Sequence, residues 1–176
     1  MLILDACIVI TFATGGYLSV IEDLRLHSVC IAARAAGEVI REPGHGALQR
    51  AIAARRVTLE TIDLEIDAEQ QALARFDSRP AFRNRGEAEV LALALTRGYI
   101  VASDENAVRK SARNELGPSR VVGTIDLLRW AVRENRLSVA AAAQTLSELD
   151  SGQRILSVFA QQGLDVREYL RTHGNG

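Results

Sequence analysis

The amino-acid sequence predicts an α/β fold, a three-layer α/β/α sandwich with a mostly parallel central sheet. Two observations lead to this class. Short apolar runs of strand length recur along the chain, and segments with helical periodicity stand between them. Because strands joined through helices run in the same direction, we expect a mostly parallel sheet covered by helices on both faces.

The first element is an apolar run over residues 1–10, which reads Met-Leu-Ile-Leu-Asp-Ala-Cys-Ile-Val-Ile. We expect a buried strand here that passes into a helix at Cys7 or just beyond. Asp5 lies inside this run. A carboxylate in that position is costly to bury without a partner, so Asp5 is the first candidate for a functional residue.

Turns, an edge strand and a helix are expected next. Pro43-Gly44-His45-Gly46 predicts a turn, and residues 15–16 and 77–86 predict loops. Residues 57–62 alternate apolar and polar side chains, which indicates an edge strand. Residues 67–76 have the pattern of an ordinary helix.

The second half alternates helices and short strands. Residues 87–95 are strong helix formers between Gly86 and Gly98. The elements expected after them are a buried strand over 99–102, a helix from about Asn106 capped by Ser103 or Asp104, a strand over 120–122, and helices over 125–135 and 138–149.

Length and composition limit the class of protein. The chain has 176 residues, 48% hydrophobic and 24% charged, with a mean hydropathy near zero, which excludes a disordered or collagen-like chain. No apolar run has the roughly 20 residues that a membrane span needs. Asp5 interrupts the first apolar stretch, so we expect no signal peptide. Cys7 and Cys30 form no disulfide framework, and we expect a cytoplasmic protein.

The charges balance overall but cluster locally. There are 21 basic and 22 acidic side chains, so the whole molecule has no electrostatic attraction to nucleic acid. Nearly all the basic residues are arginines, which bind phosphate with two hydrogen bonds at once. Either a local anion-binding patch or a compositional bias explains the clusters Arg50, Arg55 and Arg56; Arg79, Arg83 and Arg85; and Arg109 and Arg113.

Acidic side chains follow two predicted strands at equivalent places. Asp5 and Asp104 each end a strand, and ligands of parallel α/β sheets bind at the carboxyl ends of the strands. Glu87 opens the helix that leads into the second of these strands; it is a third candidate ligand or an ordinary helix-dipole carboxylate. Asp126, with Thr124 beside it, is a fourth candidate or a simple helix cap. Oxygen ligands without His or Cys suit Mg²⁺ or Mn²⁺.

Several other classes of enzyme lack their motifs. The sequence has no Gly-x-Ser-x-Gly elbow, no Walker A loop and no Gly-x-Gly-x-x-Gly, which excludes the common serine hydrolases, P-loop NTPases and dinucleotide enzymes. A phosphatase of the haloacid dehalogenase type needs an aspartate where Cys7 stands, so we reject that class as well.

Three motifs together resemble the PIN domain, and the resemblance is closest to the toxin-like (VapC-type) PIN proteins of prokaryotes. They are Leu-Asp-Ala-Cys-Ile-Val-Ile around Asp5, Gly-Glu-Ala-Glu-Val-Leu-Ala-Leu-Ala from Gly86, and Val-Ala-Ser-Asp ending at Asp104. The resemblance covers residues 1–135, the expected PIN-like nuclease domain. We expect residues 136–176 to form a helical extension packed on the domain or on a partner.

The resemblance implies a ribonuclease that depends on Mg²⁺ or Mn²⁺, often the toxin of a toxin–antitoxin pair and often a homodimer. It assigns metal binding and catalysis to Asp5, Glu87, Asp104 and Asp126. Glu42 is a further accessory acid, with Glu38 as the alternative, and Ser103 and Thr124 are accessory polar residues. We expect Arg83, Arg85 and Arg109 to bind the phosphates of RNA. An antitoxin protein is a possible partner and no membrane association is expected.

Cys7 departs from the family pattern. A polar residue is common two positions after the first aspartate, and a thiol binds a metal-bound water less well by hydrogen bonding. Cys7 and the long C-terminal segment favour an alternative function, a catalytically weak PIN-like module that binds RNA or protein.

Overall fold

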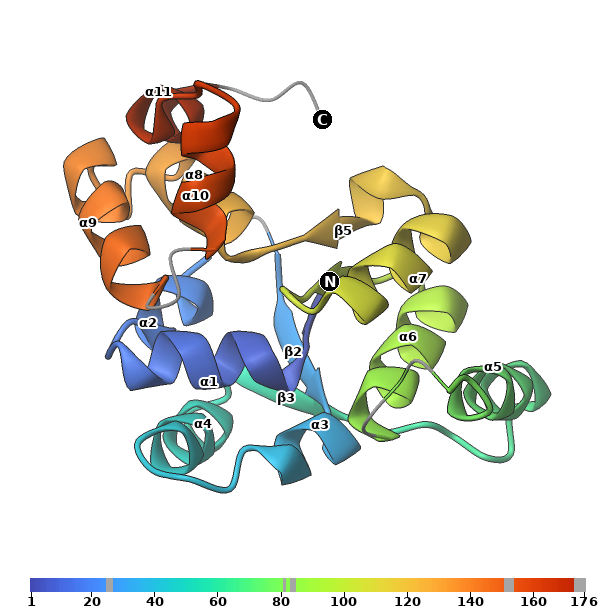
Figure 1. The fold of residues 1–176 in the computed structure, drawn as a ribbon. Coiled ribbons are helices and arrows are strands. Elements are labelled where there is room, and N and C mark those ends of the chain that lie inside the picture. Colours follow the sequence, from blue (N-terminus) through green and yellow to red (C-terminus); the bar gives the residue numbers. More distant parts are fainter. Residues whose placement is uncertain (25–26, 81, 83–84, 151–153, 173–176) are drawn as a thin grey trace.

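The chain folds around a five-stranded sheet in which every neighbouring pair is parallel (Figure 1). The computed structural model describes residues 1–24, 27–80, 82, 85–150 and 154–172. The strand order is β3-β2-β1-β4-β5, and the strands are β1 (Leu2–Leu4), β2 (Val29–Ala32), β3 (Val57–Glu60), β4 (Ile100–Ala102) and β5 (Val121–Val122).

Helices cover both faces of the sheet, as Figure 1 shows, and the three-layer α/β/α prediction is confirmed. One face carries α1 (Ala6–Thr14), α2 (Leu18–Glu22), α4 (Gly44–Ala53) and α8 (Thr124–Arg133). The other carries α3 (Ala33–Glu38), α5 (Asp67–Asp77), α6 (Arg85–Arg97) and α7 (Asn106–Leu116), with a 3₁₀ turn, η1, at Pro118–Arg120. The C-terminal helices are α9 (Val139–Leu149), α10 (Arg154–Gln161) and α11 (Val166–Arg171); α9 and α11 pack on α8.

The first strand lies at the centre of the sheet, which explains its apolar sequence. Leu2, Ile3 and Leu4 are completely buried because helices cover both faces of β1. Leu4 pairs with Ile31 of β2 on one side and with Ala102 of β4 on the other. The residues that follow β1 and β4 therefore emerge side by side at the carboxyl edge of the sheet.

The predicted strands and helices of the second half are present with shifts of one or two residues at their ends. The turn predicted at Pro43-Gly44-His45-Gly46 is wrong, because α4 begins at Gly44. A carboxylate oxygen of Glu42 accepts the backbone N–H of Gly46 at 3.1 Å and so satisfies a donor of the first helical turn. Sequence analysis also missed β2, which passes directly into α3.

The part of the chain that the structure describes contains no helix long and apolar enough to cross a bilayer. The division into a domain over 1–135 and an extension over 136–176 stays a prediction.

Candidate metal centre

The first strand delivers a buried carboxylate to the edge of the sheet. Asp5 directly follows β1, is 2% exposed, and is held by a backbone hydrogen bond from its N–H to the Ala102 carbonyl at 3.0 Å. Its Oδ2 accepts hydrogen bonds from the Ser103 hydroxyl at 2.6 Å and from the Cys7 thiol at 3.2 Å. The parallel pairing of β1 and β4 thus joins Asp5 to the residue that precedes Asp104.

The donors to Asp5 are neutral, and this leaves its charge uncompensated. Within the described residues Asp5 forms no ion pair, and burial raises the pKa of its carboxyl above the ordinary value. Repulsion from the Glu105 carboxylate adds to the rise, while the bonds from Ser103 and Cys7 oppose it. Burial beside Asp5 also raises the pKa of the Cys7 thiol far above its usual range. A bound cation would reverse both effects.

Asp5, Cys7 and Glu105 form one cluster of possible ligands. A carboxylate oxygen of Asp5, one of Glu105 and the Sγ of Cys7 all lie within 4.8 Å of one another. Sequence analysis did not select Glu105. The sequence did contain an indication of Glu105, because it directly follows Asp104 in Ser103-Asp104-Glu105-Asn106. Several residues that follow a parallel strand can lie at the same edge of the sheet, where ligands bind.

Asp104 is held by the first residues of α8. Its Oδ1 accepts the backbone N–H of Thr124 at 3.0 Å, and its Oδ2 accepts the Thr124 hydroxyl at 2.5 Å. Arg109, from α7, donates to the carbonyl of Ser103 at 2.9 Å. A side chain at position 123 would clash with Asp104 and Arg109, because a Cβ on Gly123 would lie 2.6 Å from Oδ1 of Asp104 and 2.5 Å from Nη1 of Arg109. The absence of a side chain at Gly123 therefore allows the acid and the arginine to approach β5.

A cleft of about 980 Å³, here called the acidic cleft, lies over this edge. Its polar wall combines residues from three parts of the chain that the sheet brings together, and the C-terminal helices supply an apolar wall. The polar wall includes Cys7, Glu87, Asp104, Glu105, Arg109 and Thr124, and the apolar wall is Leu149, Ile155, Val158 and Phe159. Glu87 and Asp104 thus line one cleft, and Asp5 is bonded to Cys7, which also lines it.

The N-terminal turn of α6 carries Glu87 and is fixed by two neighbouring contacts. Glu38, at the end of α3, accepts the backbone N–H of Gly86 at 3.0 Å, and a carboxylate of Glu89 accepts the backbone N–H of Arg34 at 2.7 Å. Of the two accessory acids considered, Glu38 therefore contacts the helix of Glu87, while Glu42 caps α4.

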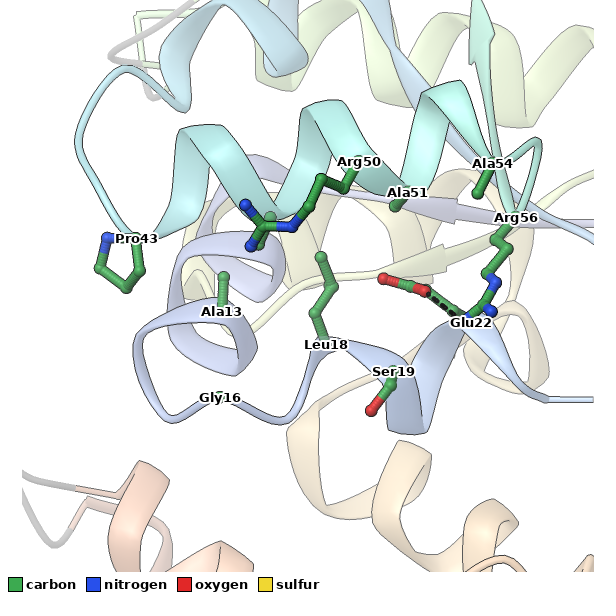
Figure 2. Close-up of a pocket in the computed structure, with 11 residues that line it drawn as sticks. Ala13, Gly16, Leu18, Ser19, Glu22, Pro43, Arg50, Ala51, Ala54 and Arg56 are labelled. Carbon is green, nitrogen blue, oxygen red and sulfur yellow. Dashed lines mark hydrogen bonds and ion pairs between the residues drawn. The ribbon is translucent and has the colours of Figure 1, made fainter.

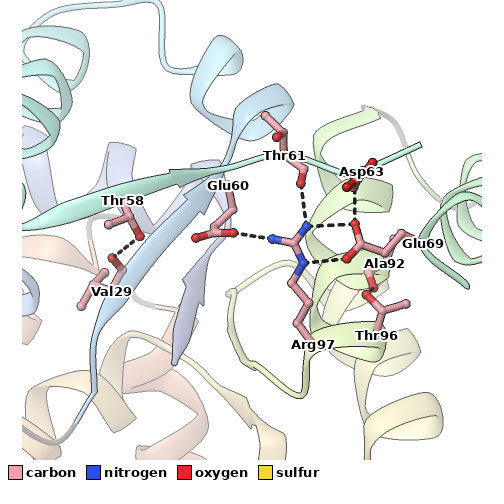
Figure 3. A network of polar contacts seen from close by, with 9 residues as sticks. All are labelled: Val29, Thr58, Glu60, Thr61, Asp63, Glu69, Ala92, Thr96 and Arg97. Atoms are coloured by element: carbon pink, nitrogen blue, oxygen red, sulfur yellow. Dashed lines mark hydrogen bonds and ion pairs between the residues drawn. The ribbon is translucent and has the colours of Figure 1, made fainter. Parts of the chain in front are cut away.

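The other end of α6 is anchored by Arg97 (Figure 3). Its Nε and Nη2 donate to the two carboxylate oxygens of Glu69 at 2.7 and 2.9 Å, and Nη1 pairs with Glu60 at the end of β3. Nη2 also donates to the Thr61 carbonyl at 2.9 Å. This network ties α6 to β3 and α5, and so fixes the helix that presents Glu87 to the cleft.

Asp126 is used differently from the three other predicted acids. Its Oδ2 accepts the backbone N–H of Gly123 at 3.0 Å, and its Oδ1 accepts the Tyr169 hydroxyl at 3.1 Å and pairs with Arg129 at 3.4 Å. It is not among the residues that line the acidic cleft. The structure thus places Asp126 at a helix cap and at a contact with α11, and its metal role stays a prediction.

The three arginines predicted to bind phosphate differ in position. Arg109 lines the cleft, and Arg85 is exposed at the start of α6, two residues before Glu87. Arg83 lies outside the described residues.

A second hollow, of about 480 Å³, lies between α4 and the segment that joins α1 to α2 (Figure 2). Arg50 and Arg56 border it, and Arg56 pairs with Glu22 at 3.3 Å. Its floor is apolar and includes Ala13 and Leu18. Glu22 is the one carboxylate among the described residues that line this hollow, and it is already paired with Arg56. The hollow therefore lacks the set of possible metal ligands found in the acidic cleft.

The residues at the sheet edge fit a divalent cation. The donor set is mainly carboxylate oxygen, which hard divalent ions prefer, with the Cys7 sulfur at its margin. Asp5 is buried next to a like charge, an arrangement that costs free energy until a cation neutralises it. The hydroxyls of Ser103 and Thr124 fix the orientation of Asp5 and Asp104, as hydrogen bonds to metal ligands do.

A comparison with protein families finds a match that covers most of the chain. The model of a family described as a PIN domain matches residues 1–162, which is most of the chain and includes every predicted acid as well as α9 and α10. No curated protein and no solved structure matches the chain.

Proposed function

The chain belongs to the PIN-domain family, whose members are generally nucleases, and from this premise we propose that it is an endoribonuclease that depends on Mg²⁺ or Mn²⁺. The observation that carries the proposal is Asp5, a buried carboxylate bonded to neutral donors beside a second acid at the mouth of a cleft. Such a site is stabilised by a divalent ion, and a divalent ion can activate water for hydrolysis of a phosphodiester without a side-chain nucleophile.

The roles of the side chains follow from their positions. Asp5, Glu87 and Asp104 hold the ion in this proposal, with Asp126 as the predicted fourth acid and Glu105 as an addition from the structure. An ion held there would lower the pKa of a bound water and would offset negative charge on the leaving oxygen. Ser103 and Thr124 keep two of the carboxylates oriented. Arg109 lines the cleft where a flanking phosphate would lie.

The finer parts of the proposal rest on the resemblance to toxin-like (VapC-type) PIN proteins. We propose a cytoplasmic toxin with an antitoxin as partner, active as a homodimer. Exposed apolar side chains support a protein interface, among them Ile10, which is 44% exposed, and Ile40, which is 73% exposed. Light scattering after size exclusion tests the dimer, and a monomer at micromolar concentration would contradict it.

The test of the nuclease is cleavage of a structured RNA pool with Mg²⁺, Mn²⁺ or EDTA. Wild type is compared with Asp5→Asn and Asp104→Asn, and with Asp23→Asn as a matched control at an exposed site. The proposal expects metal-dependent cutting that both site variants lose and the control keeps. Cutting that survives in both site variants would place the activity elsewhere or in a contaminant.

A second candidate is a PIN-like module that binds RNA or protein without efficient turnover. Cys7 in the ligand cluster favours it, because a thiol is a poorer hydrogen-bond partner for metal-bound water. This candidate expects calorimetric binding of Mn²⁺ and binding of RNA, with no cleavage under any metal.

A further inference from the structure

Three of the candidate acids each accept a hydrogen bond from a hydroxyl group. For Asp5 and Asp104 the hydroxyl comes from a residue close to the sheet edge, as described above. For Asp126 it comes from Tyr169, whose hydroxyl donates to Oδ1 at 3.1 Å. Tyr169 lies in α11, 43 positions after Asp126 in the sequence. The C-terminal helices therefore supply one of the three hydroxyl donors.

The ring of Tyr169 is held by contacts that do not involve its hydroxyl. It meets the ring of Phe159 edge to face, with centroids 5.1 Å apart, and the guanidinium of Arg129 lies 4.8 Å from its centroid. The next residue, Leu170, is completely buried, and α11 packs on α8 and α9. The position of α11 thus has other support, and these contacts direct the hydroxyl to Asp126.

Asp126 connects Tyr169 with the turn that holds Asp104. Its Oδ2 accepts the backbone N–H of Gly123 at 3.0 Å, directly before α8. The following residue, Thr124, donates both its backbone N–H and its hydroxyl to Asp104. A change in the orientation of Asp126 would therefore be passed to this turn, and the turn carries both of these donors to Asp104.

We propose that Tyr169 is a positioning residue of the candidate metal centre, which acts through Asp126 on the turn that holds Asp104. The inference rests on the nuclease function proposed above and extends its site to the C-terminal helices. A hydroxyl is a neutral donor, so Tyr169 orients the Asp126 carboxylate without cancelling its charge. Hydrogen bonds of this kind, one step beyond the metal ligands, fix the ligands' orientation and raise metal affinity.

The test removes one hydroxyl at a time. Tyr169→Phe keeps the ring that packs against Phe159 and loses the bond to Asp126. Tyr17→Phe is the matched control, because the Tyr17 hydroxyl also donates to a carboxylate and also ties a C-terminal helix to the rest of the chain, through Glu148 of α9. Neither member of that pair is among the described residues that line the acidic cleft. Titration calorimetry measures the affinity for Mn²⁺ alone, and circular dichroism in EDTA checks that each variant is folded.

Tyr169→Phe is expected to weaken Mn²⁺ binding about 3–10-fold, which is less than the 10–100-fold typical of losing a direct partner of a ligand. Tyr17→Phe is expected to change the affinity less than about twofold, as a change at a distant site does. If Tyr169 acts through Asp126, Tyr169→Phe should also have an effect of less than about twofold in protein that carries Asp126→Ala.

Cleavage of RNA gives a second measurement. At a Mn²⁺ concentration below the Kd of wild type, kcat of Tyr169→Phe should fall by about the same factor as the affinity for Mn²⁺, with KM for RNA unchanged. This division is expected because Tyr169 is not among the described residues that line the acidic cleft. A rise in KM with kcat unchanged would overturn the positioning role.

Equal effects of Tyr169→Phe and Tyr17→Phe on the affinity for Mn²⁺ would overturn the inference, since the hydroxyl would then serve only to dock a helix. An undiminished effect of Tyr169→Phe in the presence of Asp126→Ala would overturn it as well; if Asp126→Ala does not fold, the two tyrosine variants decide alone. Where wild type binds Mn²⁺ and cuts RNA, either result removes Tyr169 from the site and leaves the nuclease standing. If wild type neither binds Mn²⁺ nor cuts RNA, both proposals fail.

Discussion

Replacing Asp5 with asparagine is expected to stabilise the metal-free protein while abolishing its response to metal. The Asp5 carboxylate is 2% exposed, and an unpaired buried charge has an effective cost of several kcal/mol. Its bonds from Ser103 and Cys7 offset part of this, at about 1.5–3 kcal/mol for a hydrogen bond to a charged group. The raised pKa of Asp5 indicates that these bonds do not offset the whole cost. A net penalty on the order of 1–3 kcal/mol would remain, and Asp5→Asn removes it while its amide oxygen still accepts from Ser103.

The pH dependence has a defined sign. Because burial raises the pKa of Asp5 in the folded state, the folded protein binds this proton more tightly than the unfolded chain. The penalty is therefore complete above the raised pKa and disappears as the pH falls toward about 3.9, the ordinary value for an aspartate. The advantage of Asp5→Asn is greatest at neutral pH and vanishes in acid.

The assay is thermal unfolding in EDTA and in Mn²⁺, followed by circular dichroism. For a chain of this size about 1 kcal/mol shifts Tm by about 2–4 °C, so Asp5→Asn should melt about 5 °C higher than wild type in EDTA. Mn²⁺ at about 100 times its Kd adds about 2.7 kcal/mol to wild type, a further rise of about 5–10 °C, and nothing to the variant. The exposed control Asp23→Asn should follow wild type in both buffers.

Two results would refute this reasoning. If Asp5→Asn melts below wild type in EDTA, the buried carboxylate is not a net penalty. If Mn²⁺ raises the Tm of Asp5→Asn as much as that of wild type, Asp5 is not a ligand.

Three further predictions concern the surroundings of the site. Arg97→Met leaves the buried Glu69 without its partner and should lower the free energy of unfolding by about 3–5 kcal/mol in urea denaturation. Hydrogen bonding to Arg97 lowers the pKa of Glu69, so the loss of unfolding free energy should be constant at neutral pH and should shrink in acid, where Glu69 becomes protonated. A loss below about 1 kcal/mol at neutral pH would count against the network. Thr124→Val should weaken Mn²⁺ binding about 10–100-fold by calorimetry, with Thr96→Val, whose hydroxyl bonds within α6, as the unaffected control. Cys7→Ser should increase Mg²⁺-supported cleavage about 2–10-fold, and a decrease would show that the thiol contributes to turnover.

Much of the fold could be predicted, and the candidate acids could be selected, because local sequence patterns indicate them. A carboxylate inside an apolar run, as at Asp5, is costly enough to mark a site without any knowledge of its neighbours. Gly98 separates the strand at 100–102 from the helix that carries Glu87, and that helix begins at Arg85, next to the boundary expected at Gly86. The family match and the parallel sheet confirm the fold class that these elements predicted.

What could not be predicted depends on contacts between distant segments. β2 escaped detection because Val29–Ala32 runs without a break into the alanine-rich α3, and its pairing with β1 and β3 makes it a strand. Gly44 and Gly46 resemble a turn, but the Glu42 carboxylate satisfies a donor of the helix they begin. Asp126 has the spacing of a ligand, yet Tyr169, more than 40 positions later, occupies one of its oxygens.

The C-terminal helices were expected as an extension packed on the domain or a partner, and the sequence did not indicate that α10 would line the cleft. Its apolar residues have the same pattern whether they face the core, another protein or a substrate. What places these side chains at a cleft is the polar wall, and the residues of that wall lie in earlier parts of the sequence.

The central place of β1 has a consequence for the newly synthesised chain. Asp5 is synthesised well before Ser103 and Asp104, because the strand that brings them to it is completed only at residue 102. At about 5–20 residues per second, several seconds separate the synthesis of the first acid from that of the third. Since β1 and β2 are both synthesised before β4, a truncated nascent chain has two paired strands of the sheet available while Asp104 is still missing. If the proposed ribonuclease needs these acids together, its site is incomplete beside the messenger RNA that encodes it until Asp104 has been synthesised.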